Sequence, residues 1–223
     1  MRTAIFDLDG TLVDTALDLL HAGNFTYEEL GWSVRLKPDF SDGIAIGGGR
    51  SMIRYGLMSE GITFTEADVS QIYPVLLKNY ERTIDKNSYV YDGIVAVLEK
   101  LKGSGWRLGV CTNKPEAPAH LLLSILGIRD YFDSFIGSDT VGVAKPNPEP
   151  LFAAITRAGG NKKAAVLIGD TKTDRDTAKA ANVKSLLVNY GHGALTQDLQ
   201  ILNPDGIVNS ASEIPEFLEM MVK

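Results

Sequence analysis

Asp7–Leu12, with the sequence DLDGTL, decides the fold of this chain, because it follows directly on the short apolar run Thr3–Phe6. An apolar run that ends in two acids, a glycine and a threonine predicts a buried strand with a charged turn at its C-terminal end. Side chains two residues apart point to one side of an extended backbone, so we expect Asp7 and Asp9 to lie close together. Neighbouring carboxylates repel unless a cation separates them or one takes up a proton. The strand end therefore predicts a metal site, a reaction, or both.

The chemistry that two such acids favour is phosphoryl transfer. One aspartate attacks phosphorus and splits a difficult displacement into two easier ones. The other protonates the leaving alcohol and then deprotonates the attacking water. Mg²⁺ would hold the nucleophile and a phosphate oxygen together. Gly10 permits the tight turn, and we expect its amide to point at the phosphate.

Asp-x-Asp-Gly-Thr after a strand resembles the opening motif of the haloacid dehalogenase-like (HAD) hydrolases. The resemblance implies that Asp7 is the nucleophile and that Asp9 is the general acid/base. It also implies that Gly10 and Thr11 lie beside the substrate. The resemblance covers nearly the whole chain.

Composition limits the remaining classes of function. The chain has 223 residues, one cysteine and a formal net charge of −6. A negative chain argues against a nucleic-acid partner, and no apolar run approaches the roughly 20 residues needed to cross a bilayer. With no signal-peptide pattern and a single cysteine, we expect a cytoplasmic protein, either a monomer or a homodimer. An anionic substrate then requires a locally positive pocket, made by a metal ion, a few cations and helix N-termini.

The roughly 75 residues that follow the first strand predict helices only. Apolar residues at helical spacing cover Ala16–Gly31, Ser51–Met58 and Glu66–Ile84, with a kink or a break expected at Pro74. Residues 15–86 are thus predicted to form an all-helical insertion, which the resemblance identifies as a cap domain after the first strand.

Residues 1–14 and 87–223 predict the other domain, because strands and helices alternate there. Such alternation indicates an α/β fold with a doubly wound, mostly parallel sheet, which the resemblance identifies as the Rossmann-like HAD core. Ligands of such sheets bind beyond the C-terminal ends of the strands. The predicted strands are Thr3–Phe6, Arg107–Cys111, Phe135–Ile136, Ala165–Ile168, Ser185–Val188 and Gly206–Val208.

Two further motifs follow predicted strands. Thr112 and Asn113 come directly after Arg107–Cys111, where a hydroxyl and an amide suit a bound phosphate oxygen. Members of this family have four sequence motifs, or stations, that form the active site, and Asp-x-Asp-Gly-Thr is the first. Thr112 matches the second station, which hydrogen-bonds the transferring phosphoryl group. A plain helix N-cap is the alternative. Lys145, in the sequence Lys-Pro-Asn-Pro, resembles the third station, which implies that it binds the phosphate and screens Asp7.

The last motif is Gly169-Asp170-Thr171-Lys172-Thr173-Asp174, after the apolar run Ala165–Ile168. It resembles the family's fourth station, Gly-Asp-x-x-x-Asp. The resemblance implies that Asp170 ligates Mg²⁺ together with Asp7 and the backbone carbonyl of Asp9. Asp174, one helical turn on, either supports the metal through water or orients Lys145. Acidic residues at a helix N-terminus are the alternative explanation.

The cap contains one unusual segment, Ile46–Arg54, with three consecutive glycines before an arginine. It resembles the cap loop of phosphoglycolate phosphatases. Arg50 is the candidate substrate contact, since a guanidinium grips a carboxylate with two hydrogen bonds, and Arg54 is a second candidate. The alternative is a turn with a solvated arginine.

The motifs together predict a Mg²⁺-dependent phosphatase for a small phosphorylated metabolite, with 2-phosphoglycolate as the leading substrate. Sugar phosphates and nucleotides are alternative substrates. A phosphosugar mutase with the same core is the second enzyme hypothesis. A dehalogenase is disfavoured, since a halide needs no proton from Asp9. A non-enzymatic binding protein is disfavoured because all four stations are present.

Overall fold

The computed structural model describes residues 1–38, 43–44, 47–192 and 197–222. The chain forms two compact units. Met1–Asp14 and Val90–Lys223 make up the core unit, and Thr15–Tyr89 make up the helical unit.

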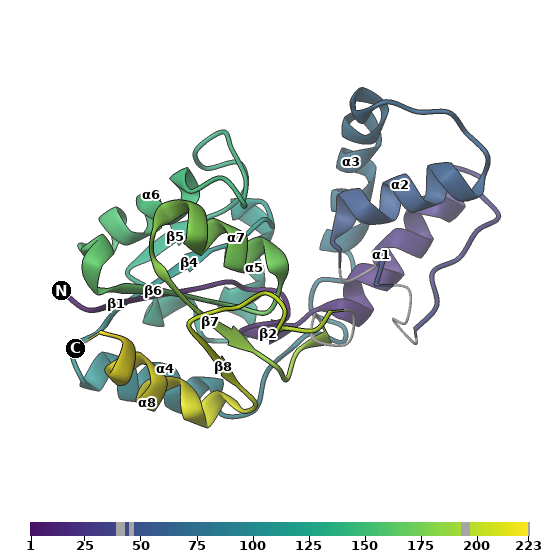
Figure 1. The fold of residues 1–223 in the computed structure, drawn as a ribbon. Helices are drawn as coiled ribbons and strands as arrows, with labels where there is room; N and C mark the ends of the chain where they lie inside the picture. The colour runs from purple at the N-terminus through teal and green to yellow at the C-terminus, as the bar shows by residue number, and fades with distance from the viewer. Residues whose placement is uncertain (39–42, 45–46, 193–196, 223) are drawn as a thin grey trace. The chain divides into compact units, whose positions relative to one another are not determined.

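The core unit contains a sheet of six parallel strands in the order β5-β4-β1-β6-β7-β8 (Figure 1). β1 lies at its centre, with Phe6 opposite Val110 on one side and Ile168 on the other. The α/β class and the parallel sheet predicted from the sequence are therefore confirmed. The strands are β1 (Thr3–Phe6), β4 (Arg107–Cys111), β5 (Ser134–Ile136), β6 (Ala165–Gly169), β7 (Lys184–Val188) and β8 (Gly206–Val208).

Helices cover both faces of this sheet. α6 (Glu149–Arg157) and α7 (Lys172–Ala181) pack on one face, and α4 (Ile94–Gly103) and α8 (Ile214–Met221) lie together on the other (Figure 1). Because both faces are covered, the central strands are buried along their whole length. α5 (Glu116–Ile125) follows β4, and single 3₁₀ turns occur at Arg129–Tyr131, Lys162–Ala164 and Ala211–Glu213.

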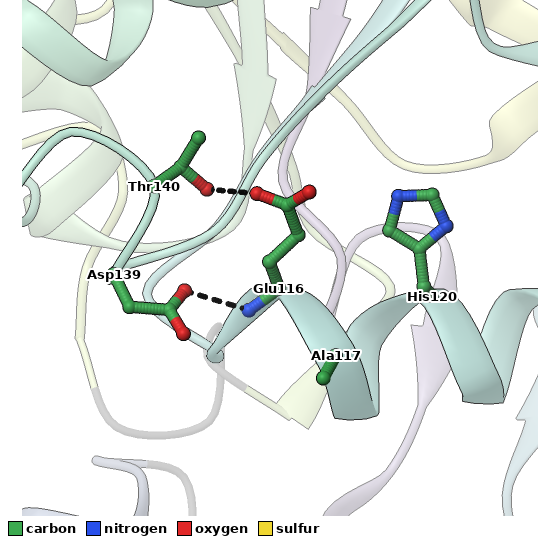
Figure 2. Close-up of a pocket in the computed structure, with 5 residues that line it drawn as sticks. All are labelled: Glu116, Ala117, His120, Asp139 and Thr140. Atoms are coloured by element: carbon green, nitrogen blue, oxygen red, sulfur yellow. Dashed lines mark hydrogen bonds between the residues drawn. The ribbon is translucent and has the colours of Figure 1, made fainter.

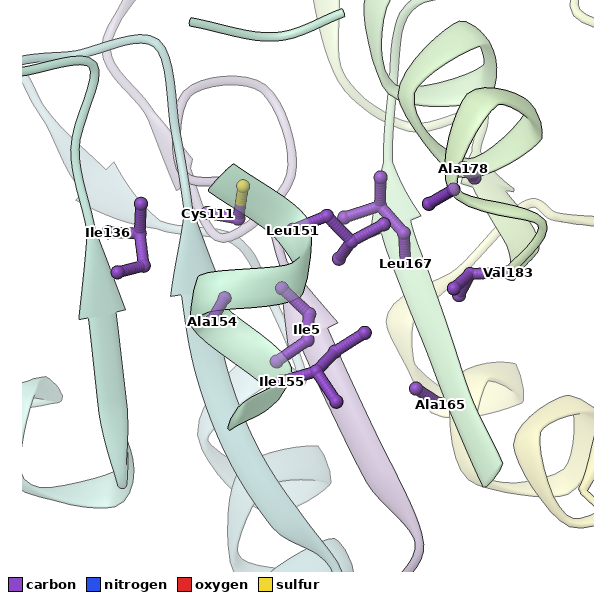
Figure 3. Packing of buried hydrophobic residues seen from close by; sticks show 11 residues of the cluster. Ile5, Cys111, Ile136, Leu151, Ala154, Ile155, Ala165, Leu167, Ala178 and Val183 are labelled. Atoms are coloured by element: carbon purple, nitrogen blue, oxygen red, sulfur yellow. The ribbon is translucent and has the colours of Figure 1, made fainter. Parts of the chain in front are cut away.

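The packing between the sheet and α6 and α7 fixes the positions of the strand ends. Alternate strand residues, such as Ile5, Cys111 and Leu167, point toward α6, where Leu151 and Ile155 meet them (Figure 3). Interiors of this kind are close-packed, so truncating Leu167 to alanine would cost roughly 2–5 kcal/mol. Burial raises the pKa of the Cys111 thiol to about 12, so Cys111 is an inert core residue, as the sequence indicated.

The helical unit contains α1 (Ala16–Glu29), α2 (Gly49–Ser59) and α3 (Glu66–Glu81), and α3 packs against both of the others. Thr65 begins α3 in a capping box with Asp68, which satisfies two helix N-terminal groups at once. The break or kink expected at Pro74 does not interrupt the helix. Residues on both sides of Pro74 bury one apolar face, and this packing outweighs the lost backbone hydrogen bond.

Two local features of the fold were not predicted from the sequence. The short strands β2 (Val13–Asp14) and β3 (Tyr89–Val90) form a separate two-stranded sheet. Two residues are too few to give a sequence pattern. The buried carboxylate of Asp18 accepts hydrogen bonds from the backbone N–H groups of Asn87 and Ser88, which ties the start of α1 to the end of the helical unit. In the described residues, no helix is long and apolar enough to cross a membrane.

Candidate active site

The C-terminal ends of β1, β4 and β6 lie side by side, which brings together residues that are far apart in the sequence. Asp7 follows β1, and its backbone N–H donates to the carbonyl oxygen of Ile168 in β6, 2.8 Å away. Asp170 follows β6, and Thr112 follows β4. The parallel pairing with β1 at the centre therefore places the two acids and the threonine at one edge of the sheet.

Lys145 holds the buried carboxylate of Asp7. Its Nζ atom lies 3.0 Å from Oδ1 of Asp7 and 2.6 Å from Oδ1 of Asp174. Burial raises the pKa of Asp7 to about 7, although Lys145 opposes this shift. Burial alone would lower the pKa of the Lys145 ammonium, but the two carboxylates more than reverse that effect and leave it raised. Lys145 is therefore a fixed positive charge beside the predicted nucleophile.

Asp170 is held by the turn that follows β1. The hydroxyl of Thr11 donates to Oδ1 of Asp170 at 3.2 Å. Gly10 has a φ of +80°, and a Cβ at this position would lie 2.2 Å from Oδ2 of Asp170. Only glycine combines this backbone conformation with so close an approach. Burial, followed by the charges of Asp174 and Asp7, raises the pKa of Asp170 well above its usual value.

These contacts correct the roles expected for Gly10 and Thr11. The backbone N–H of Gly10 donates to the carbonyl oxygen of Val13 at 2.9 Å, so it closes the turn instead of pointing at a phosphate. The Thr11 side chain is fully buried and orients Asp170. Both residues act on the site through Asp170, which a sequence motif alone does not reveal.

The donor set fits a small divalent cation. Asp7, Asp170 and Asp174 each offer a carboxylate oxygen, and these three atoms lie within 4.8 Å of one another. Hard oxygen ligands of this kind suit Mg²⁺. Lys145 balances only one of the three charges, so the ionised cluster carries a surplus of two negative charges. Burial is the main cause of the raised pKa values of Asp7 and Asp170, and the charge of Asp174 adds to it. A divalent cation would neutralise the surplus charge of the ionised cluster.

Both carboxylate oxygens of Asp174 contact protein groups. Its Oδ1 atom meets Lys145, and its Oδ2 atom accepts hydrogen bonds from the backbone N–H and the hydroxyl of Thr171 at the start of α7. Of the two roles considered for Asp174, these contacts favour the orientation of Lys145. The helix-cap alternative is also correct, because the same carboxylate performs both tasks.

Asp9 has a partner that was not predicted, Lys114. The Nζ atom of Lys114 lies 2.9 Å from Oδ1 of Asp9, and the Lys114 side chain is only 5% exposed. Most lysines are solvated, so residue type alone did not indicate a functional role for the lysine in the turn Thr112–Pro115. Its place near a strand end, directly after Thr112 and Asn113, was the available clue.

Thr112 and Asn113 shape the turn after β4. The buried hydroxyl oxygen of Thr112 accepts a hydrogen bond from the backbone N–H of Lys114 at 3.1 Å. The Asn113 amide pairs with the Lys145 backbone in both directions, at 2.8 and 3.0 Å. Asn113 was expected to bind substrate, but both ends of its side chain hold the loop that carries Lys145.

Arg50 and Arg54 belong to the helical unit. The Arg50 guanidinium lies 4.7 Å from the ring centroid of Tyr73 and donates to Ser70 Oγ at 3.1 Å. Arg54 instead forms two hydrogen bonds with Glu66, at 2.7 and 2.8 Å. Gly49 has a packing role, since a Cβ there would lie 2.8 Å from Leu76. Ile46, the first residue of the predicted cap loop, lies outside the described residues.

An open pocket of about 390 Å³ lies elsewhere in the core unit, at the start of α5 (Figure 2). Its polar lining is mutually hydrogen-bonded: Asp139 accepts from the Glu116 backbone N–H at 2.8 Å, and the Thr140 hydroxyl donates to the Glu116 carboxylate. His120 also lines it, and burial lowers the pKa of this imidazole. The pocket contains none of the residues predicted to act on a substrate. It is lined by Glu116, Ala117, His120, Asp139 and Thr140.

Solved structures have the same fold. A predicted phosphoglycolate phosphatase from Haemophilus somnus superposes with a TM-score of 0.84, covers 97% of both chains and is 22% identical in sequence. A haloacid dehalogenase-like hydrolase from Streptococcus pneumoniae has a TM-score of 0.79 and 26% identity, over 97% of this chain and 98% of that one. These matches confirm the fold predicted from the sequence.

Curated relatives agree with this assignment. A phosphoglycolate phosphatase from Agrobacterium fabrum is 33% identical over 98% of this chain and 93% of its own length. Another from Nitrosococcus oceani is 34% identical over 96% of this chain and 95% of its own length. The family model described as haloacid dehalogenase-like hydrolase matches residues 4–188. This chain belongs to the haloacid dehalogenase-like hydrolases.

Proposed function

We propose that this protein is a Mg²⁺-dependent phosphatase that hydrolyses 2-phosphoglycolate to glycolate and inorganic phosphate. The curated relatives named above support a phosphatase, and their names support this substrate. We further propose that it works in the cytoplasm, as a monomer or a homodimer. The observation that carries the proposal is the contact between Asp7 and Lys145, next to Asp170.

Asp7 performs the first half of the reaction. Its carboxylate oxygen attacks phosphorus, a new O–P bond forms, and the bond from phosphorus to the alcohol oxygen breaks. The departing alkoxide takes a proton from the carboxyl group of Asp9 and leaves as glycolate. Lys145 and the Thr112 hydroxyl support the phosphoryl oxygens, where negative charge develops. The product of this half is an aspartyl-phosphate on Asp7.

Asp9 and water perform the second half. Asp9 left the first half as a carboxylate, so it can take a proton from a water molecule as that water attacks phosphorus. The bond between the Asp7 oxygen and phosphorus breaks, which releases inorganic phosphate and restores both acids. Bound Mg²⁺, held by Asp7, Asp170 and the backbone carbonyl of Asp9, would neutralise charge on the phosphoryl group. Uncatalysed hydrolysis of phosphate monoesters needs acceleration approaching ~10²¹-fold, so several such groups must act together.

A panel of phosphate monoesters tests the proposal. We expect phosphate release with Mg²⁺ from 2-phosphoglycolate at a kcat/KM well above those for sugar phosphates and nucleoside monophosphates. EDTA should abolish the release, and added Mg²⁺ should restore it. A mutase would instead convert a phosphosugar into its isomer, release little phosphate and require a bisphosphate activator. Preference for another ester would overturn the substrate assignment, and no release from any ester would overturn the phosphatase.

A further inference from the structure

The ion pair between Lys114 and Asp9 is a second buried-lysine pair at the C-terminal end of β1, separate from the pair that Lys145 makes with Asp7. Lys114 Nζ lies 2.9 Å from Asp9 Oδ1, while Lys145 Nζ lies 3.0 Å from Asp7 Oδ1. Both lysine side chains are almost completely buried, at 5% and 1% exposure. Each of the two acids at the end of β1 therefore has its own ammonium group.

The backbone of Lys114 is fixed at both of its polar groups. Its N–H donates to the Thr112 hydroxyl at 3.1 Å, and its carbonyl oxygen accepts from the backbone N–H of Ser138 at 3.1 Å. A buried lysine pays a large desolvation penalty unless its charge is matched, and Asp9 matches it. The side chain therefore has little freedom to leave the Asp9 carboxylate.

The Asp9 carboxylate is more accessible than its partner, at 29% exposure. One oxygen, Oδ1, meets the ammonium. An acid that is ion-paired and still partly open to solvent can meet a reacting molecule. Restricting the orientation of a catalytic group lowers the entropic cost of reaching the transition state.

We propose that Lys114 is a positioning residue for the general acid/base, and that it holds the Asp9 carboxyl group toward the leaving oxygen of the ester. The inference rests on the proposed function, because it assigns to Asp9 the proton transfers described above. In this proposal, Lys145 is the positive charge beside the nucleophile Asp7, and Lys114 positions the proton donor Asp9.

Esters with different leaving groups distinguish a lysine that positions Asp9 from a lysine that only stabilises the fold. An alkyl ester such as 2-phosphoglycolate expels a basic alkoxide, which must be protonated as it departs. 4-Nitrophenyl phosphate expels a stabilised phenolate, which needs little help from an acid. For both substrates, kcat/KM reports the steps up to departure of the leaving group, so it isolates the role of Asp9 as an acid.

The experiment compares kcat/KM for these two substrates in the wild type and in Lys114→Met, Lys114→Arg and Asp9→Asn. We expect Lys114→Met to lower kcat/KM for 2-phosphoglycolate by about 10²-fold, the lower end of the usual acid–base contribution, and for 4-nitrophenyl phosphate by less than about threefold. Asp9→Asn should show the same selectivity, and adding Lys114→Met to it should cause little further loss. Lys114→Arg keeps the charge and should recover part of the alkyl-ester activity.

Lys102→Met is the matched control, because Lys102 also lies 3.0 Å from an aspartate, Asp133, at a more exposed position. It should leave the ratio of the two kcat/KM values unchanged. Equal losses on both substrates in Lys114→Met, or additive losses with Asp9→Asn, would overturn the inference. If Lys114→Met does not fold, Lys114→Gln, which keeps a polar end without the charge, replaces it, and an unchanged ratio in that variant would overturn the positioning role.

Failure of the proposed substrate can be told apart from failure of this inference. If 2-phosphoglycolate is not hydrolysed but another alkyl phosphate is, that ester replaces it in the comparison and the role of Lys114 is tested as before. If the wild type hydrolyses neither alkyl nor aryl phosphates, the proposed function and this inference are both overturned.

Discussion

Lys145 and Asp174 form an ion pair of 2.6 Å in which each side chain is only 1% exposed. The other carboxylate oxygen of Asp174 caps the N-terminus of α7 through Thr171. The lysine that meets Asp7 is thus anchored to a helix that packs on the sheet. Because a buried charge without a partner is costly, the pair holds the ammonium in one place.

Asp174→Asn should destabilise the fold and slow the reaction. Asparagine keeps one oxygen for the helix cap but leaves Lys145 with a single carboxylate partner. Breaking a buried pair in this way costs about 3–5 kcal/mol. Urea unfolding should show this loss of stability, and phosphate release should show a lower kcat, since Lys145 is free to move away from Asp7.

Asp176→Asn is the control for this prediction. Asp176 also pairs with a lysine, Lys172, but both side chains are well exposed. A surface pair of this kind contributes about 0–1 kcal/mol. Similar losses in the two variants would mean that burial of the Asp174 pair has no special importance.

The sequence allowed Asp7 and Asp170 to be predicted because each directly follows an apolar run, and it allowed Lys145 to be predicted from the motif Lys-Pro-Asn-Pro. Asp7, Asp170 and Lys145 meet as expected, since parallel strands end at the same edge of a sheet. Lys114 was missed, because a lysine has no pattern that distinguishes a buried ammonium from a solvated one. Burial depends on tertiary packing, and no local window of sequence contains it.

The roles of neighbouring residues were harder to predict than their positions. Asn113 lies at a strand end, as expected, yet its amide pairs with the backbone of a loop 32 residues away. The Gly10 amide is used inside its own turn. The hydrogen-bond partners of backbone and amide groups depend on the folded geometry around them, so residue type alone does not predict these partners.

Gly10→Ala should lower the affinity for Mg²⁺. The new Cβ would lie 2.2 Å from Oδ2 of Asp170, so this carboxylate must move. Gly159→Ala is the matched control, because Gly159 also has a positive φ, of +73°, but open space around its Cβ. Both variants should lose about 1–2 kcal/mol of stability from backbone strain. Titration with Mg²⁺ should show weaker binding in Gly10→Ala alone; equal Mg²⁺ affinities would argue against Asp170 as a ligand.

Asp7→Asn should abolish turnover without unfolding the protein. The change is nearly isosteric, but an amide does not attack phosphorus as a carboxylate does. We expect kcat to fall by at least about 10⁴-fold, in line with the loss of other nucleophiles. Circular dichroism should show unchanged secondary structure. A variant with near-normal kcat would show that another group is the nucleophile.

The affinity for Mg²⁺ should fall as the pH falls below about 7. Burial raises the pKa of Asp7 to about 7 in the metal-free protein, so at lower pH a proton must leave before the carboxylate can bind a cation. One displaced proton weakens the apparent affinity by up to about tenfold for each pH unit. Isothermal titration in two buffers with different ionisation heats measures the protons released.

The stability of the metal-free protein should change in the opposite direction. The pKa of Asp7 is higher in the folded state than its usual value of 3.8, so the folded state binds this proton more tightly. The contribution of Asp7 to stability is then greatest at low pH and decreases as the pH rises toward 7. Asp7→Asn should flatten this dependence. A metal-free wild type that gains stability between pH 5 and 7 would contradict the raised pKa.

Substitution of Arg50 tests how the substrate carboxylate is recognised. The Arg50 guanidinium stacks on Tyr73, which leaves its planar edge suited to a carboxylate, whereas Arg54 already makes two hydrogen bonds with Glu66. If Arg50 binds the carboxylate of 2-phosphoglycolate, Arg50→Ala should raise KM for this ester by about 10-fold or more, the effect of losing a charged hydrogen bond of about 1.5–3 kcal/mol. 4-Nitrophenyl phosphate has no carboxylate, so its KM should change little.

Arg54→Ala separates this effect from a general loss of positive charge. Both substitutions remove one arginine from the same helix, α2, so any long-range attraction of anions falls equally in the two variants. Only direct contact with the carboxylate distinguishes them. A larger rise in KM for 2-phosphoglycolate with Arg50→Ala than with Arg54→Ala is therefore expected, while equal rises would mean that Arg50 acts only through its positive charge.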